Sequence, residues 1–287
     1  MKTSIIFGIT GQDGFYLRET LQKKGHHVIG VSRSSGGDVA DRQAVDTLVR
    51  QVQPDYIFHL AANSTTRHDA LFENHATIAT GTLNVLEAVK QHAPHCRVFI
   101  TGSGVQFVNT GKPISENDAF APLSAYAIAR IHSAYAARYY RSLGIKAYVG
   151  YLFHHESPLR KPNHLCKKIA ELAKRVQAGS QEHIILGDPS VRKEVGFAGD
   201  IAEGIWTLVN QESHFEATIG TGKAYSIQAW IETCFSKVNC DWRNAIRIQA
   251  DGFAPEYPIL VSDPTTLFSL GWRPTVDIDA LAEMMLS

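Results

Sequence analysis

Neither sign of charge is in excess in this chain. Its 28 lysine and arginine residues balance 28 aspartate and glutamate residues, so the formal net charge is zero. Because nucleic acids and anionic membranes attract basic surfaces, we expect no nucleic-acid partner and no membrane partner. No apolar run approaches the roughly 20 residues that span a bilayer, and residues 1–8 lack the apolar block of a signal peptide. These absences predict a cytoplasmic protein.

Cysteine is scarce, and its spacing does not suggest a cross-linked or metal-bound fold. Cys96, Cys166, Cys234 and Cys240 include no C-x-x-C pair, which a disulfide framework or a zinc site commonly shows. The 13 histidines include two adjacent pairs but no H-E-x-x-H motif. We therefore expect reduced, mostly structural thiols and no bound metal.

A glycine turn stands near the start of the chain. Residues 3–8 are a short apolar run rich in β-formers, and the residues that follow the turn place apolar side chains at helical spacing. This order predicts a strand, a glycine turn and a helix. Glycines let a pyrophosphate approach the backbone, and the helix N-terminus offers free N–H groups to its charge. The turn residues expected to contact a dinucleotide are Gly8, Thr10, Gly11, Gln12, Asp13 and Gly14.

The second predicted strand, residues 27–32, is followed by Arg33 and Ser34. An acidic residue at this position accepts a hydrogen bond from the ribose of NAD, whereas an arginine accommodates the 2′-phosphate of NADP. We therefore predict NADP rather than NAD; the alternative is a solvated turn arginine. Asp38 either reaches the adenine amine or only caps a helix. The other residues placed along the cofactor are Val39, Leu60, Ala61, Ala62 and Leu152.

Predicted helices over residues 41–52 and 77–91 alternate with predicted strands over 56–60 and 97–101. This alternation predicts an α/β protein with a Rossmann-type doubly wound parallel sheet, whose ligands bind at the carboxyl ends of the strands. Beyond Gly150 the alternation loosens. We therefore expect a dinucleotide-binding domain over residues 1–150 and a smaller C-terminal substrate-binding domain over 151–287, some segments of which return to the first.

Tyr126 and Arg130 are the candidate catalytic pair. They lie one turn apart in a predicted helix, so the hydroxyl and the cation share one face, and Thr101 or Ser103 brings a hydroxyl to the same edge of the sheet. A tyrosine is a poor base at neutral pH, but an adjacent fixed positive charge favours its deprotonated form. The set predicts hydride transfer at a carbinol carbon, with Tyr126 as acid and base. The alternative is a structural tyrosine in a tyrosine-rich helix.

Several stretches resemble the GDP-mannose 4,6-dehydratases, a group of the extended short-chain dehydrogenase/reductase family. Residues 152–158 carry the F-x-H-E-S-P phrase that is specific to that group, and further matches lie at residues 8–14, 53–62, 81–88 and 220–222. The resemblance implies an NADP cofactor, hydride transfer at sugar C4 and a nucleotide-sugar substrate, with a GDP-hexose favoured. The chain lacks the insertion before Asp38 through which such proteins form tetramers, so we expect a homodimer.

The chain also departs from the family pattern at the catalytic centre. The family carries Thr-Ser-Glu where this chain has Gly102, Ser103 and Gly104, and it carries lysine at the position of Arg130. Arginine keeps its charge but cannot release a proton. Three functions therefore stay open: a dehydratase, a reductase or epimerase of a nucleotide-linked 4-keto-6-deoxy sugar, and a catalytically weakened NADP-binding partner or sensor.

The resemblance places most substrate contacts in the second half of the chain. His154 stands where the family has asparagine, Leu159 replaces one of two arginines, and Ala254 replaces another. These changes weaken the argument for GDP as the nucleotide. Lys167 and Lys168 either contact the diphosphate or form a solvated helix face. The candidate substrate-binding residues are Ser64, His154, His155, Glu156, Arg160, Lys168, Arg192, Lys193 and Glu256.

Overall fold

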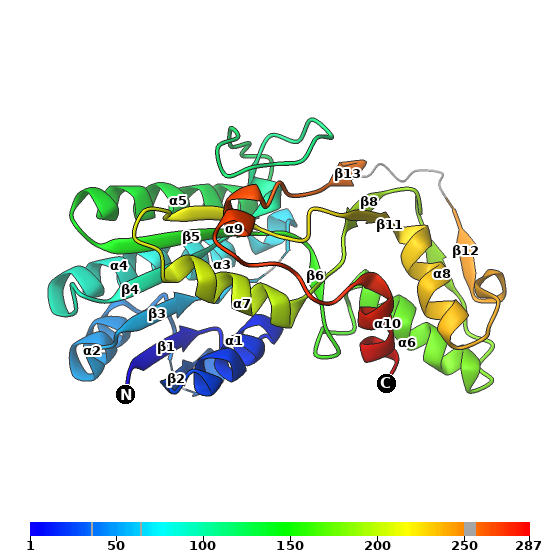
Figure 1. Ribbon diagram of the computed structural model, residues 1–287, viewed down its shortest axis with the longest axis horizontal. Coiled ribbons are helices and arrows are strands. Elements are labelled where there is room, and N and C mark those ends of the chain that lie inside the picture. Colours follow the sequence, from blue (N-terminus) through cyan, green and yellow to red (C-terminus); the bar gives the residue numbers. More distant parts are fainter. Residues whose placement is uncertain (36, 64, 250–256) are drawn as a thin grey trace.

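The computed structural model describes residues 1–35, 37–63, 65–249 and 257–287. A six-stranded sheet forms the larger lobe, with strand order β10-β5-β4-β3-β1-β2 (Figure 1). All neighbouring strands run parallel. The strands are β1 (Thr3–Phe7), β2 (His27–Val31), β3 (Tyr56–His59), β4 (Arg97–Ser103), β5 (Lys146–Leu152) and β10 (Glu216–Ile219). The chain moves outward from β1 to β2 and then returns past β1 to β3, which opens a crevice at the strand carboxyl ends. The predicted doubly wound parallel sheet is confirmed.

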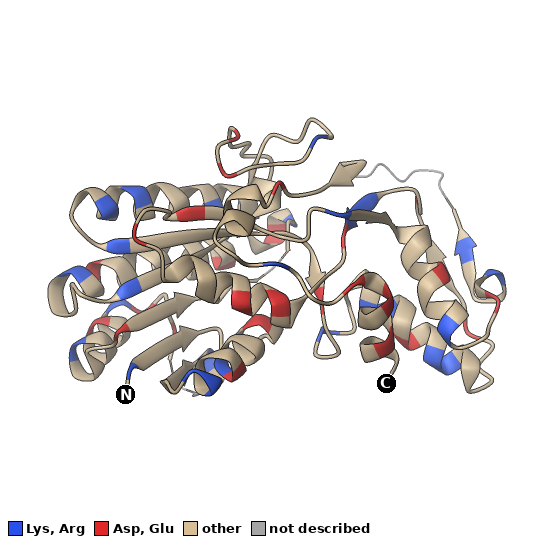
Figure 2. Ribbon diagram, viewed as in Figure 1, with Lys and Arg blue, Asp and Glu red and all other residues tan. Residues whose placement is uncertain are grey.

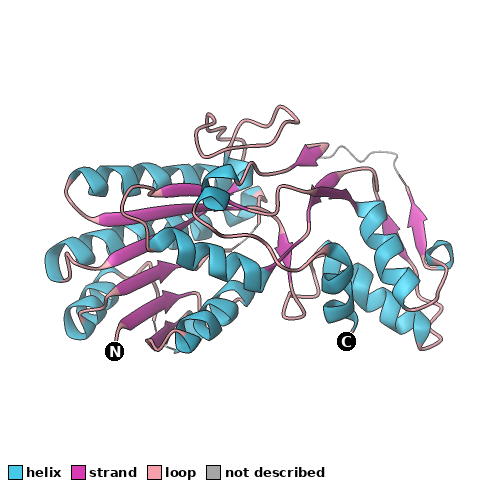
Figure 3. Cartoon of the chain, in the orientation of Figure 1, coloured by secondary structure: helices cyan, strands magenta, loops and turns pink. Residues whose placement is uncertain are grey.

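Helices cover both faces of this sheet (Figure 3). Alternate strand residues point to opposite faces. Ile5 and Ile57 therefore pack with α2, α4 and α5, whereas Ile6 and Phe58 pack with α1 and α7; all four side chains are fully buried. The helices are α1 (Gln12–Lys23), α2 (Arg42–Val52), α4 (Gly81–His92), α5 (Ala125–Ser142) and α7 (Ala198–Val209).

Side-chain caps explain where two helices of this lobe begin. Asp41 accepts hydrogen bonds from the backbone N–H groups of the first turn of α2, and Ser124 accepts one from Ala127 N at 3.1 Å to start α5. The helix predicted over residues 77–91 is different in detail. The short helix α3 (Leu71–Asn74) continues through a π-helical segment, His75–Thr80, into α4. The wider turn is a feature that apolar spacing does not reveal.

The smaller lobe contains helices α6, α8 and α10 around a separate apolar core. Short strands pair beside them, and α7, β10 and α9 return to the larger lobe (Figure 1). The helices are α6 (Leu165–Gln177), α8 (Ile227–Lys237), α9 (Thr265–Ser269) and α10 (Ile278–Leu286). The strands are β6 (His155–Glu156), β7 (Ile184–Leu186), β8 (Arg192–Glu194), β9 (Gly196–Phe197), β11 (Ala224–Ser226), β12 (Ile246–Ile248) and β13 (Ile259–Leu260). Single 3₁₀ turns occur at Arg33–Ser35, His68–Ala70, Gly104–Gln106 and Trp242–Asn244.

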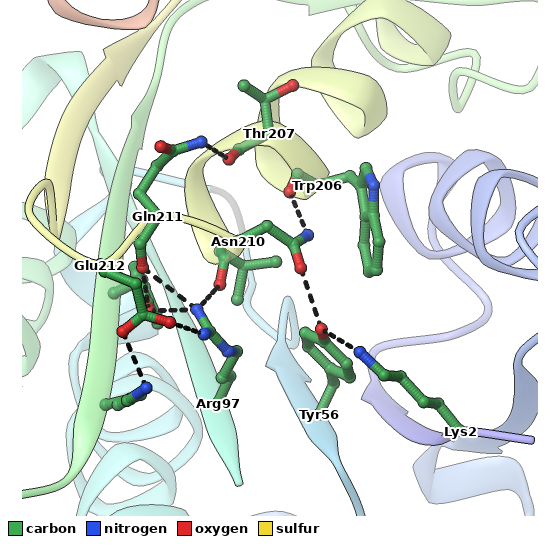
Figure 4. Close-up of polar contacts among 11 residues, drawn as sticks. Lys2, Tyr56, Arg97, Trp206, Thr207, Asn210, Gln211 and Glu212 are labelled. Atoms are coloured by element: carbon green, nitrogen blue, oxygen red, sulfur yellow. Dashed lines mark hydrogen bonds and ion pairs between the residues drawn. The ribbon is translucent and has the colours of Figure 1, made fainter. Parts of the chain in front are cut away.

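A polar network fastens α7 to the sheet edge that lies opposite the crevice (Figure 4). Arg97 donates from Nη1 at 2.9 Å to the carbonyl oxygen of Val209, the last residue of α7, and at 3.1 Å to that of Gln211, just beyond the helix. Nearby, Tyr56 donates to Asn210 Oδ1 at 2.9 Å. The network holds a helix from the second half of the chain against strands from the first half.

Basic and acidic residues are interspersed along the chain in both lobes (Figure 2), as the balanced composition leads one to expect. Within the described residues, no helix combines the length and the apolar character needed to span a membrane.

Candidate active site

Two adjoining cavities, of about 350 and 200 Å³, lie at the carboxyl ends of the strands. Both are lined by residues of the glycine turn, including Gly8 and Gly11. The larger cavity also brings together segments from both lobes. Its sequence-predicted residues are Gly8, Thr10, Gly11, Gln12, Asp13, Gly14, Leu60, Ala62, Thr101, Ser103, Tyr126, Arg130, Leu152, His154, His155, Arg160 and Lys193. The smaller cavity adds Arg33, Asp38, Val39 and Ala61.

The glycine turn has a backbone that side chains would not tolerate. Gly8 has φ of +93°, and a Cβ atom there would lie 2.7 Å from the backbone nitrogen of Ala61. A Cβ atom at Gly14 would lie 2.4 Å from the carbonyl oxygen of Gly8. Helix α1 begins directly after Gly11, without a side-chain cap. Its first N–H groups therefore face a cradle that fits a pyrophosphate.

His155 ties this turn to the second half of the chain. Its Nδ1 lies 2.7 Å from the carbonyl oxygen of Phe153, and its Nε2 lies 2.8 Å from Asp13 Oδ1. Since both partners accept hydrogen bonds, the arrangement calls for a doubly protonated ring beside a carboxylate. Burial opposes the charge, but the Asp13 carboxylate outweighs burial and raises the pKa of His155. For Asp13, burial is likewise outweighed by the charge of His155, which lowers the pKa of that carboxyl.

Tyr126 and Arg130 lie on the same face of α5 and both line the larger cavity. The guanidinium carbon of Arg130 is 5.0 Å from the ring centroid of Tyr126, and Nη1 donates to the carbonyl oxygen of Thr101 at 2.5 Å. Arg130 is only 3% exposed. Its positive charge is therefore held between the tyrosine ring and the end of β4.

The two candidate hydroxyl groups at the end of β4 differ in their surroundings. Thr101 donates from Oγ1 to the carbonyl oxygen of His59 at 2.9 Å and is nearly buried. Ser103 is half-buried and lines the cavity. Of the two, Ser103 is the better placed to meet a ligand. Below them, burial and then the charge of Arg130 lower the pKa of His59 to about 4, so this histidine is neutral.

The family that the sequence resembles has a glutamate at the position of Gly104, but here an aromatic ring occupies the space that such a side chain would need. A Cβ atom at Gly104 would lie 2.8 Å from the ring of Phe153. A Cβ atom at Gly102 would similarly lie 2.4 Å from the ring of Tyr151. Among the described residues that line the larger cavity, Asp13 is the only carboxylate, and it is paired with His155. The cavity thus offers no second carboxylate near Tyr126 in the described part of the chain.

Other predicted residues lie elsewhere. Glu156 has no exposed surface and lies behind the cavity wall. Lys168 and Arg192 are exposed and line neither cavity in the described structure; Arg192 donates to the carbonyl oxygen of Ala224.

Ser34 is exposed and, in the same described part, does not line the smaller cavity. Arg33 does line it, and forms an ion pair of 3.1 Å with Glu73. Ser64 and Glu256 fall outside the described residues.

Sequence reasoning missed several residues that line the site. Lys161 borders both cavities, and Thr66, His164 and Tyr257 border the larger one. Lys161 follows shortly after the F-x-H-E-S-P phrase, but no local pattern marks it. Its position depends on the loop over residues 157–164, which reaches from the smaller lobe to the glycine turn.

Comparisons with known proteins agree with this architecture. The family model described as GDP-mannose 4,6 dehydratase matches residues 34–285. GDP-mannose 4,6 dehydratase 1 of Arabidopsis thaliana is 30% identical over 320 residues, which cover 99% of this chain and 89% of that protein. GDP-mannose 4,6-dehydratase of Sinorhizobium fredii is 28% identical and covers 98% of this chain and 94% of its own length.

Solved structures share the fold at lower sequence identity. RMD from Pseudomonas aeruginosa, complexed with NADPH, has a TM-score of 0.87 and 19% identity, covering 100% of this chain and 96% of that one. UDP-glucose 4-epimerase from Thermotoga maritima, with UDP-glucose, has a TM-score of 0.86 and 19% identity, covering 99% and 97%. The family model and the Arabidopsis relative, which both extend over most of the chain, place this protein in the GDP-mannose 4,6-dehydratase family.

Proposed function

We propose that the protein transfers hydride between NADP and the C4 carbonyl–alcohol pair of a nucleotide-linked hexose, and that it works as a reductase of a 4-keto sugar rather than as a dehydratase. The observation that carries the proposal is that Tyr126, Arg130 and Ser103 line one cavity, while the ring of Phe153 fills the space beside Gly104. Reduction of a keto sugar by hydride transfer needs only the first three residues. Dehydration needs a further base, which the resemblance would place at the position of Gly104.

The cofactor assignment is supported by the turn and the small cavity. The glycine turn would hold the pyrophosphate, while Arg33 and Lys161 border the cavity that would receive the adenosine end. When bound, a nicotinamide cofactor supplies or accepts the hydride. One solved relative by fold binds NADPH, and UDP-glucose 4-epimerase of Thermus thermophilus is complexed with NAD. The basic residues at the small cavity favour the 2′-phosphate of NADP.

Proton transfer falls to Tyr126. Its hydroxyl protonates the sugar oxygen during reduction and removes that proton in the reverse direction. Arg130 places a permanent positive charge beside the ring, because its guanidinium is fixed there and cannot release a proton. Ser103 donates to or accepts from the same sugar oxygen and so orients it. Each of these roles uses a residue that borders the larger cavity.

The substrate end of the cavity is cationic. Arg160, Lys193 and Lys161 line it, and His164 lies beside them. This charge suits the diphosphate of a nucleotide sugar. Family relatives are named for GDP-mannose, so we propose a GDP-linked hexose.

We also propose a homodimer. Large apolar side chains are exposed along α4 and α5: Leu83, Ile128, Tyr135 and Tyr139 are 39%, 48%, 57% and 61% exposed. Exposed apolar side chains grouped on neighbouring helices are typical of a subunit interface. A second copy of this chain would cover them.

The proposed reaction can be tested by product mass. The protein is incubated with NADPH and a panel of nucleotide sugars, with and without a separate 4,6-dehydratase that supplies 4-keto sugars. A gain of two hydrogens, seen only when the keto sugar is supplied, is the expected result. Loss of water from a GDP-hexose in the absence of the second enzyme would show a dehydratase and would overturn the assignment.

A second candidate is a cofactor-binding partner with weak or no turnover. The observation that favours it is Arg130, which is buried and cannot release a proton. Under this alternative, NADPH raises the melting temperature but no product forms. Faster turnover of the added dehydratase when this protein is present would then support the partner role.

A further inference from the structure

We propose that His154, Glu156 and Cys166 bind a divalent metal ion of the zinc type, with one coordination position open to the larger cavity. This proposal differs from the expectation of no metal that the cysteine and histidine spacing suggested. It is independent of the hydride chemistry, because it rests on side chains that the proposed reaction does not use as acid, base or orienting group.

The three donors already converge. Their ligand atoms lie within 4.8 Å of one another. His154 Nε2 is 2.9 Å from Glu156 Oε1 and 3.6 Å from Cys166 Sγ. Tetrahedral ligands held about 2.0–2.3 Å from a zinc ion lie roughly 3.3–3.6 Å from one another. The two separations from His154 Nε2 therefore lie within an ångström of this range, so that His154 can share one ion with either neighbour.

Glu156 supplies the observation that points to a ligand. Its side chain has no exposed surface, and neither carboxylate oxygen has a hydrogen bond within the described structure. His154 Nε2 approaches Oε1 at 2.9 Å and Arg160 Nε approaches Oε2 at 3.4 Å, but neither contact is an aligned hydrogen bond. A buried carboxylate in this condition is costly unless a partner satisfies it. A metal ion bound to Oε1 would do so.

Metal binding would use the Nε2 lone pair of His154 and would form a bond from Cys166 Sγ to the ion, with release of the thiol proton to solvent.

Neighbouring cations limit which ion and which oxygen can take part. Arg160 faces Glu156 Oε2, so Oε1, which lies on the side of His154, is the oxygen available to a metal ion. Lys193 and His164 also face this group. Their charge opposes a bound cation, but the Glu156 carboxylate and a Cys166 thiolate together balance an ion of charge +2. A mixed nitrogen, oxygen and sulfur set suits zinc better than magnesium or calcium.

The open position follows from where the donors lie. His154 borders the larger cavity, whereas Glu156 and Cys166 are buried behind it, in β6 and the first turn of α6. A fourth ligand would therefore come from the cavity side, as water or as an oxygen of a bound substrate. Three protein ligands and one open position are typical of zinc sites that meet substrate.

Cobalt substitution provides the test. The full-length protein is stripped of metal and titrated with Co²⁺, whose sulfur-to-cobalt charge-transfer absorption reports a thiolate ligand. We expect about one equivalent to bind with this absorption. Cys166→Ser should abolish the absorption, and His154→Asn should weaken binding at least tenfold. Cys240→Ser, which alters a cysteine outside the cluster, should keep both.

Absence of the absorption in the native protein, or its persistence in Cys166→Ser, would overturn the proposal. Circular dichroism establishes that each variant is folded before titration. Should Cys166→Ser fail to fold, Glu156→Gln serves as the second variant: unchanged Co²⁺ affinity in that protein would equally count against the site. Zn²⁺ competition for the bound Co²⁺ then identifies the preferred ion, and failure to compete contradicts the assignment to zinc.

Discussion

Arg130 is held by contacts that leave its guanidinium little freedom. It lies against the ring of Tyr126 and donates to the carbonyl oxygen at the end of β4. A lysine in the same position would carry a point charge on a flexible stem, whereas the planar guanidinium is fixed by its own geometry. The site thus has a permanent positive charge beside the tyrosine, but this cation cannot release a proton. In the proposed reaction, proton transfer therefore ends at Tyr126 or at solvent.

Removal of the Tyr126 hydroxyl tests its role as acid and base. In Tyr126→Phe we expect kcat for reduction of the keto sugar to fall about 10²–10⁴-fold, the usual contribution of a general acid. The dissociation constant of NADPH should stay nearly constant, because the ring and Arg130 remain. Stopped-flow absorbance and fluorescence titration measure the two quantities. Tyr139→Phe, on the exposed side of the same helix, is the control, and an equal loss in both variants would contradict the assignment.

Lys161 offers a second test at the level of one residue. Because it borders both cavities, Lys161→Ala should weaken NADPH binding roughly tenfold through the loss of one charged contact. An equal loss for NADH would place the ammonium group at the pyrophosphate, and a loss for NADPH alone would place it at the 2′-phosphate. Calorimetric titration measures both. Unchanged affinity for both cofactors, as expected for the exposed control Lys112→Ala, would contradict a contact.

Helices α4 and α5 present the apolar surface that we assign to a dimer. Ile128→Glu would place a charge in that interface, and desolvation of an unpaired charge opposes association. We expect the variant to sediment as a monomer at concentrations where the native protein sediments as a dimer. Gln43→Glu, on the exposed first turn of α2, should leave the dimer intact. A native protein that is already monomeric would contradict the proposal.

Arg97 joins α7 to the sheet, so replacing it should lower the free energy of unfolding. Arg97→Met leaves the carbonyl oxygen of Val209, the last residue of α7, without its donor, whereas the Gln211 carbonyl keeps the Tyr148 hydroxyl, so we expect the free energy of unfolding to drop by about 1–3 kcal/mol. Lys146→Met is a matched control, since Lys146 is more exposed and bonds only to Glu212 of the same network. Urea unfolding measures both. Equal losses would mean that the carbonyl contacts contribute little.

Acid stability of the whole molecule should depend on His59. Its pKa is about 4 in the folded protein because of burial and the charge of Arg130, against an ordinary value of 6.5. Between these values the unfolded chain binds a proton that the folded chain does not. This contribution is fully present above about pH 6.5 and is lost as the pH falls toward 4, to a limit of about 3 kcal/mol.

Urea titrations at pH 7 and pH 4.5 measure this dependence. His59→Asn should unfold with a smaller loss of stability between the two pH values than the native protein shows, whatever its stability at pH 7. His95→Asn changes an exposed histidine and should keep the native pH dependence. A native-like slope in His59→Asn would show that other groups govern acid unfolding.

The local sequence determined the features that depend on neighbouring residues in the chain. The strand, glycine turn and helix over residues 3–23 follow from β-rich and helical spacing and from the φ that Gly8 adopts. Tyr126 and Arg130 are four residues apart, about one helical turn, and this spacing alone placed them on one face of a helix. The alternation of strands and helices likewise predicted the parallel sheet.

Only the tertiary structure decided which residues from distant parts of the chain surround the glycine turn and the Tyr126–Arg130 pair. The ring that fills the space at Gly104 comes from the end of β5, and the ammonium group at both cavities comes from the loop over residues 157–164. Cys166 reaches His154 and Glu156 because the first turn of α6 packs behind β6. Such contacts join segments whose separation in the chain carries no periodic signal. They are set by how the two lobes pack, which is why local spacing located the candidate chemistry and packing determined what surrounds it.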